Sequence, residues 1–76
     1  MHQNVEWSTV RDVPGGNGYR YKLGAFPNGK FVVNDVYAII DGVEAGGSNV
    51  SGSAFDSREA AHAAALKRAR EHGWKG

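Results

Sequence analysis

Two stretches in the first third of the chain alternate between apolar and polar residues, which is the pattern of a half-buried β-strand. The first spans residues 5–10 and is followed by a breaker-rich segment, residues 14–18, which predicts a loop. The second spans residues 19–26 and is the more regular of the two. It places Tyr19, Tyr21, Leu23 and Ala25 on one face of the strand and Arg20, Lys22 and Phe26 on the other.

A tight hairpin is predicted directly after the second strand. Asn28 and Gly29 both tolerate the positive φ angles that such a turn requires, so residues 31–40 should fold back as an antiparallel strand. Asn34 and Asp35 interrupt this β-rich run. They are compatible with a β-bulge in one long strand or with a second turn between two short strands, and the bulge is favoured.

The Asp-Gly dipeptide at positions 41–42 is a strong hairpin signal, so a further strand is predicted to begin at Val43. Glycine-rich residues 46–49 predict a loop. After that loop, residues 50–55 are expected to form a short edge strand.

A helix is predicted over residues 57–72, which are rich in helix formers. Asp56 is the expected N-cap, with Glu59 completing a capping box, and Gly73 offers the left-handed position that commonly ends a helix. Trp74 is expected to fold back on the turn around Ala69. The face predicted to be buried consists mostly of alanine and comprises Ala61, Ala65, Ala69, His62, Leu66 and His72.

This order of elements predicts one α+β domain over residues 1–76, with strands within residues 5–55. The expected architecture is an antiparallel meander of three to five strands with the helix packed on one face. Apolar residues make up 41% of the chain, but ten of them are alanine and cysteine is absent. Because domains of this size bury little apolar surface, we expect the core to be thin. The large core side chains should come from the sheet: Tyr19, Tyr21, Leu23, Val33 and Ile39.

The net charge of +1 excludes a strongly basic nucleic-acid protein, although the charge is unevenly distributed. Residues 1–56 carry a net charge of −2, whereas residues 57–76 carry +3. No apolar run approaches the ~18 residues of a membrane span, and the first residues lack the features of an export signal. We therefore expect a cytoplasmic protein without a membrane partner.

Sequence motifs do not indicate catalysis, a metal or a cofactor. Residues 24–30 match the glycine and lysine spacing of a phosphate-binding loop, but Phe31 stands where Ser or Thr is needed to hold Mg²⁺. His62 and His72 are ten residues apart, not the four that favour shared chelation from one helix, and Ser48 lacks the glycine pattern of a nucleophile elbow. We also expect too little volume for a pocket of several hundred Å³. The sequence therefore predicts a protein that is not an enzyme.

Two surfaces are candidates for binding. The first is the outward arc of the helix, with Arg58, Lys67, Arg68 and Arg70, and Lys75 nearby. The second is the sheet face away from the helix, where Arg20, Lys22 and Lys30 stand beside aromatic residues. Basic residues interleaved with aromatic residues are suited to nucleic-acid contacts, and the candidate aromatic residues are Trp7, Phe26 and Tyr37.

The antiparallel strands followed by a helix that opens with residues 55–61, Phe-Asp-Ser-Arg-Glu-Ala-Ala, resemble the small amino-terminal, arm-type DNA-binding domains of tyrosine integrases. The resemblance covers roughly residues 19–72 and implies a sheet that enters the major groove, with Arg20, Lys22 and Lys30 facing it. The first hypothesis is therefore a nucleic-acid-binding accessory module. The alternative is a small protein of phage or mobile-element type that docks on, or inhibits, a larger protein complex. A third hypothesis is homodimerisation through an uncovered sheet face or edge.

Overall fold

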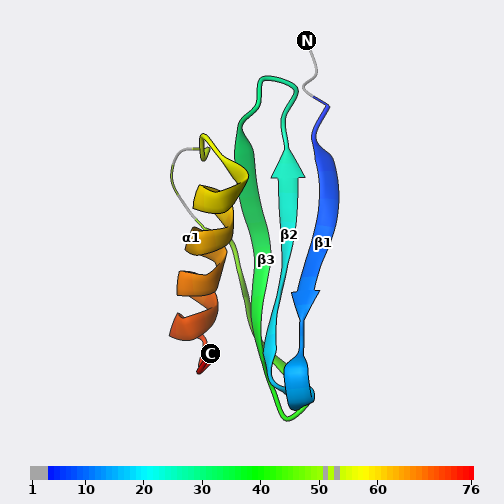
Figure 1. The fold of residues 1–76 in the computed structure, drawn as a ribbon, viewed down its shortest axis with the longest axis vertical. Helices are drawn as coiled ribbons and strands as arrows, with labels where there is room; N and C mark the ends of the chain where they lie inside the picture. Colours follow the sequence, from blue (N-terminus) through cyan, green and yellow to red (C-terminus); the bar gives the residue numbers. More distant parts are fainter. Residues whose placement is uncertain (1–3, 51, 53) are drawn as a thin grey trace.

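The computed structural model describes residues 4–50, 52 and 54–76 of the chain. Its strands are β1 (Glu6–Asp12), β2 (Gly18–Ala25), β3 (Phe31–Ile40) and β4 (Val43–Ser48), and they form one antiparallel sheet in the order β1-β2-β3-β4. A short 3₁₀ turn, η1 (Pro14–Gly16), joins β1 to β2, and the helix α1 (Arg58–Glu71) follows the sheet. Figure 1 shows the helix along one face of an elongated molecule of 42 × 17 × 17 Å. The predicted α+β class is confirmed.

Two irregularities of the sheet, the bulge in β3 and the turn between β3 and β4, lie where the sequence predicted them. β1 and β2 pair without a shift from Glu6 opposite Ala25 to Asp12 opposite Tyr19. The register of β2 with β3 shifts once, because Asp35 adopts a φ of 52° and inserts a bulge into an unbroken β3. Asp41 and Gly42 have φ angles of 52° and 79°, as a tight two-residue hairpin requires. The bulge and this hairpin are both confirmed.

The structure corrects the prediction for the segment after Val43. Gly46 and Gly47 belong to β4 and do not form a loop. Their φ angles of 114° and 92° permit close approach, and a Cβ on Gly46 would lie only 2.6 Å from the imidazole ring of His72. Among the described residues of 50–55 there is no regular strand, and Phe55 forms an isolated bridge with Phe31. Residues 51 and 53 of that predicted strand lie outside the described residues.

The start of the helix also differs from the prediction. Ser57 is the N-cap, with an extended backbone and a hydroxyl that accepts the N–H of Ala60 at 3.1 Å. The carboxylate of Asp56 forms an ion pair with the ammonium group of Lys30 instead. Since the capping box needs an acid three residues after the cap, Glu59 stands one position too early. The expected cap at Asp56 and its capping box are therefore wrong.

The end of the helix follows the prediction closely. His72 is the C-cap, Gly73 has a φ of 111°, and the N–H of Trp74 donates to the carbonyl of Ala69 at 3.0 Å. The indole ring of Trp74 then packs edge-on against Tyr19, with ring centroids 5.1 Å apart. Among the described residues, no helix combines the length and apolar character needed to cross a bilayer.

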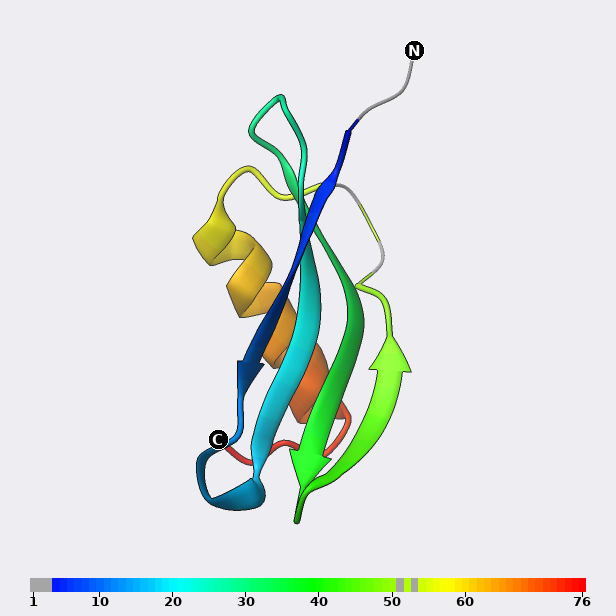
Figure 2. The same ribbon diagram turned by 90° about the vertical axis from the view of Figure 1, so that its right-hand side faces the viewer.

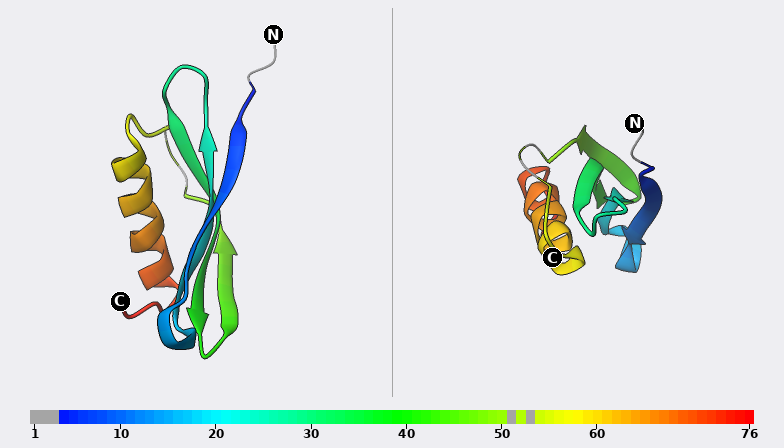
Figure 3. Two further views of the ribbon diagram at one scale, coloured as in Figure 1. Left: turned by 45° about the vertical axis from the view of Figure 1, so that its right-hand side comes forward. Right: turned by 90° about the horizontal axis from the view of Figure 1, so that it is seen from above.

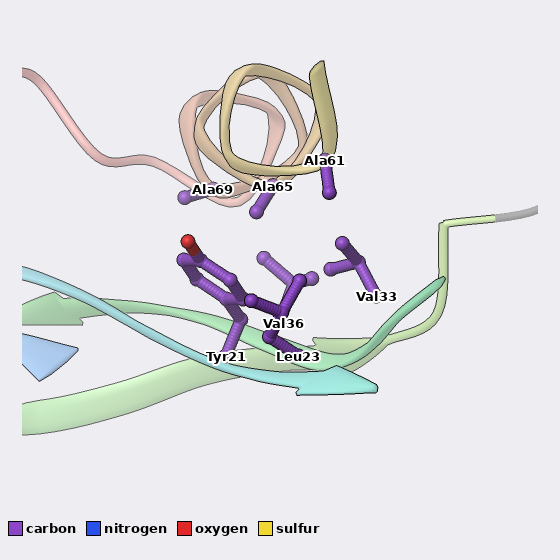
Figure 4. Close-up of a cluster of buried hydrophobic side chains, with 7 residues drawn as sticks. All are labelled: Tyr21, Leu23, Val33, Val36, Ala61, Ala65 and Ala69. Atoms are coloured by element: carbon purple, nitrogen blue, oxygen red, sulfur yellow. The ribbon is translucent and has the colours of Figure 1, made fainter. Parts of the chain in front are cut away.

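The core lies between the alanine stripe of the helix and the large side chains of β2 and β3. Ala61, Ala65 and Ala69 are 0%, 1% and 0% exposed. Figure 4 shows them pointing at a layer of side chains that are at most 2% exposed: Tyr21, Leu23, Val33 and Val36. Small helix residues let the helix axis approach the sheet, and large sheet residues fill the interface at the density of a protein interior.

Candidate functional site

One face of the sheet remains free of the helix, and Figure 2 looks directly onto it. Because Tyr21 and Leu23 are buried beneath α1, the intervening residues of β2 point to the opposite face. Their cross-strand neighbours on β1 share that face. We call this surface the open face and define it by Trp7, Thr9, Arg11, Arg20, Lys22, Gly24, Tyr37 and Glu44. Figure 3 shows from two further directions that α1 lies only on the other side of the sheet.

Arg20 connects three strands across the open face. Its guanidinium carbon lies 4.3 Å from the ring centroid of Tyr37 on β3, and its Nε and Nη2 atoms donate to the two carboxylate oxygens of Glu44 on β4, at 2.7 and 3.3 Å. The hydrogen bond to Glu44 raises the pKa of Arg20, and the same bond lowers the pKa of Glu44. Gly47 provides the room, because a Cβ there would lie 3.0 Å from the Tyr37 ring. The charge of Arg20 is therefore compensated and its geometry is fixed.

Lys22 is also compensated by an acid from another strand. Its ammonium nitrogen lies 3.7 Å from a carboxylate oxygen of Asp35, the residue that forms the β3 bulge. Both side chains are about half exposed, so this ion pair contributes little to the free energy of folding. Its carboxylate still neutralises the positive charge of Lys22 locally. Lys22 and Asp35 line a shallow hollow of about 260 Å³ together with Asn34 and Trp7.

Trp7, on β1, extends its indole ring over Gly24 of β2 and lines one side of this hollow. Gly24 stands opposite Trp7 in the register, and a Cβ at Gly24 would be 2.9 Å from Cζ3 of the indole and 2.9 Å from side-chain atoms of Val5 and Val32. The absence of a side chain at Gly24 thus allows the ring to approach the backbone of β2. Even so, Trp7 is 47% exposed, which makes it a large apolar group available for contact.

Sequence reasoning did not single out Arg11 or Thr9. Both are exposed on β1, where Arg11 faces Arg20 and Thr9 faces Lys22. The alternation of β1 would have placed them on the same face as Trp7. Only the pairing of β1 with β2 brings them beside the two predicted basic residues.

The remaining predicted cations lie apart from the open face. Lys30 lies in the β2–β3 hairpin, where its ion pair lowers the pKa of Asp56. The structure therefore brings together Arg20 and Lys22 but not Lys30. On the helix, the cations are held by neighbouring rings and acids or point outward: Arg58 lies over Phe31, Arg70 lies over Trp74, Arg68 pairs with Glu71, and Lys67 is exposed.

Both helix histidines join the helix to hydroxyl groups of the sheet. Nδ1 of His62 lies 2.5 Å from the hydroxyl oxygen of Tyr21, and Nε2 of His72 lies 2.6 Å from that of Ser48. Burial raises the pKa of Tyr21 to about 12, so this phenol stays protonated at neutral pH. Within residues 4–50, 52 and 54–76, no three His, Cys, Asp or Glu side chains converge as metal ligands would.

A second hollow corrects the expectation that the domain has too little volume for a pocket. It measures about 540 Å³ and forms where η1, the β3–β4 turn and residues 73–76 meet. Ile39, Ile40 and Trp74 supply apolar surface, while its titratable lining residues are Asp12, Asp41 and Lys75. Neither helix histidine lines it. The volume arises because three chain segments converge at one end of the sheet.

Comparison of the chain with protein-family models, curated proteins and solved structures finds no match. The resemblance to integrase arm-type domains therefore stays a prediction that rests on the chain's own residues.

Proposed function

We propose that the chain is a non-enzymatic binding module that docks on another protein through its open face. The observation that carries this proposal is the composition of the face: Trp7, Tyr37 and Arg20 are exposed or half-buried on the same side of the sheet, and Trp7 lines a shallow hollow there. Tryptophan, tyrosine and arginine are the residues that most often dominate the binding energy of protein interfaces.

The charge pattern favours a protein over a polyanion. Arg20 and Lys22 each stand against a carboxylate, so a phosphate backbone laid over them would also meet Glu44 and Asp35. A protein surface with both signs of charge can complement such a face, because each ion pair can accept or donate further hydrogen bonds at the rim of an interface. The hollow beside Trp7 can receive one side chain of the partner.

The experiment is a comparison of variants in affinity capture from a lysate of the organism that encodes the chain. The Trp7→Ala/Arg20→Ala variant removes the anchors of the open face, and Lys67→Ala/Arg70→Ala is the matched control on the helix. We expect one protein to be retained by the wild type and the helix variant but lost from the open-face variant. The purified partner should then shift the NMR resonances of β1 and β2. Retention that only the helix variant abolishes would contradict the proposal.

A nucleic-acid ligand is the second candidate, and one observation favours it. Arg11 stands directly opposite Arg20 across β1 and β2, and like charges in that position destabilise a sheet. Glu44 already pairs with Arg20, so Arg11 is the cation of this pair that a phosphate would contact. The resemblance to arm-type domains implies the same face for DNA. Fluorescence anisotropy with single-stranded and duplex oligonucleotides at ~50 mM salt tests this candidate. Binding at tens of micromolar that weakens steeply with salt and is lost in Arg11→Ala/Arg20→Ala would support it, whereas no binding would eliminate it.

A further inference from the structure

The two edge strands of the sheet differ in how they are protected from pairing with another chain. β4 has six residues, carries Gly46 and Gly47 at positive φ, and has a register shift against β3. β1 is regular: its pairing with β2 is unshifted over its whole length, and it contains no proline, glycine or lysine. Edge strands without such features offer their free backbone groups to another strand.

The direction of those free groups follows from a neighbouring bridge. Phe31 and Phe55 exchange both N–H···O bonds, at 2.9 and 2.7 Å, so the backbone groups of Phe31 point away from β2. Its partner in β2, Ala25, must then direct its own groups toward β1 and Glu6. Because the groups alternate along an antiparallel strand, the residues of β1 that point theirs to the open edge are Trp7, Thr9 and Arg11.

These three residues make the edge self-complementary. When two copies of β1 run antiparallel about a two-fold axis at Thr9, Thr9 faces Thr9 of the second copy and Trp7 faces Arg11 of the second copy. Each of these pairs has its backbone groups correctly directed for mutual hydrogen bonds. The Trp7 and Arg11 side chains also share the open face, where an indole ring and a guanidinium attract each other.

The fold leaves room for this pairing. The helix packs against β3 and β2, and in Figure 1 no residue of the described ranges 4–50, 52 and 54–76 lies beyond β1 on its free side. We propose that two copies of the chain join through their β1 edges in this register, so that the two sheets become one and the two open faces become continuous. This proposal does not depend on the proposed docking function, because the protein alone suffices to test it.

Sedimentation equilibrium of the full chain measures the dimer directly. Thr9→Pro removes one outward N–H per chain at the two-fold axis but leaves the bonds of β1 to β2. We therefore expect the dissociation constant of the dimer to rise at least about 100-fold. Thr9→Val keeps that N–H and is the matched control, for which we expect a dimer. A wild-type chain that remains monomeric at about 200 μM, or a dimer that Thr9→Pro leaves intact, would overturn the proposal.

A gain of affinity tests the register independently of any loss of folding. On the helix side of the sheet the Thr9-centred register places Glu6 opposite Asp12 of the second copy, which is an unfavourable pair. Glu6→Lys converts both such pairs into attractive ones, so we expect dimerisation about ten-fold tighter than in the wild type. The double variant Glu6→Lys/Asp12→Lys restores repulsion and should return to weaker association. An unchanged dimer in Glu6→Lys would overturn the register and with it the proposal.

Discussion

Replacing Ala65 with leucine should destabilise the domain strongly, because the side chain has no space to enter. Ala65 is 1% exposed and lies between Ala61 and Ala69, which are both fully buried. Across the interface, Tyr21 and Val36 are 2% and 0% exposed, so no side chain there can rotate into solvent without breaking the core.

Adding three heavy atoms to such a site forces the helix away from the sheet or the sheet side chains off their rotamers. Overpacking of this kind typically costs about 1–3 kcal/mol, and we expect about 2 kcal/mol for Ala65→Leu. For a domain of this size that corresponds to a melting temperature lower by about 8–16 °C. The urea midpoint should fall by about 2 M if the slope is ~1 kcal/mol/M.

Ala63→Leu is the matched control, since Ala63 is exposed on the same helix. We expect it to change stability by less than about 0.5 kcal/mol. Thermal and urea unfolding followed by circular dichroism measure both variants. If Ala65→Leu were as stable as Ala63→Leu, the close packing of α1 on the sheet would be refuted.

Three further predictions concern single contacts. Burial raises the pKa of Tyr21 in the folded protein above its unfolded value of 10.0. The stabilisation that this shift contributes is therefore complete below pH 10 and is lost as the pH rises toward 12. Wild-type protein should therefore lose about 1 kcal/mol more than Tyr21→Phe between pH 9 and 11, and equal losses would contradict this assignment. Ser57→Ala should cost about 1 kcal/mol through the lost N-cap, clearly more than Asp56→Ala, as urea unfolding of both variants can show. Gly24→Ala should displace the Trp7 ring and cost about 1 kcal/mol; an unshifted indole N–H resonance of Trp7 would argue against the close approach of the ring to Gly24.

Local chemistry was sufficient to predict much of the sheet. The alternation around Tyr21 and Leu23 identifies the buried face of β2, because a strand with one covered face places an apolar side chain on that face at every second position. The β3 bulge was predictable because Asp tolerates the left-handed conformation that Asp35 adopts.

Features decided by contacts distant in sequence could not be predicted in this way. Asp56 and Ser57 are both good N-caps, and the choice between them depends on Lys30, which draws the Asp56 carboxylate away from the helix. Gly46 and Gly47 have the composition of a loop, yet in the fold they make room for His72 and Tyr37.

In the candidate site, too, some features follow from local sequence and others depend on contacts distant in sequence. Alternation alone put Arg20 and Lys22 on one face, but their acidic partners come from other strands, and Glu44 follows Arg20 by 24 positions in the sequence. The sequence alone does not reveal that acids neutralise these cations, and it therefore favoured a nucleic acid as the ligand. The ion pairs are the reason that we propose a protein instead. The larger hollow was likewise unpredictable, since three separate chain segments form it.

Site-specific photo-crosslinking tests the central claim, docking of another protein on the open face, most directly. A benzophenone-bearing phenylalanine analogue replaces Trp7 in one variant and Ala63, on the exposed side of the helix, in the other. Irradiation in the native cell should link the position 7 variant, and not the position 63 variant, to a different protein. Crosslinks that form at position 63 but not at position 7, or that join position 7 to nucleic acid alone, would contradict it.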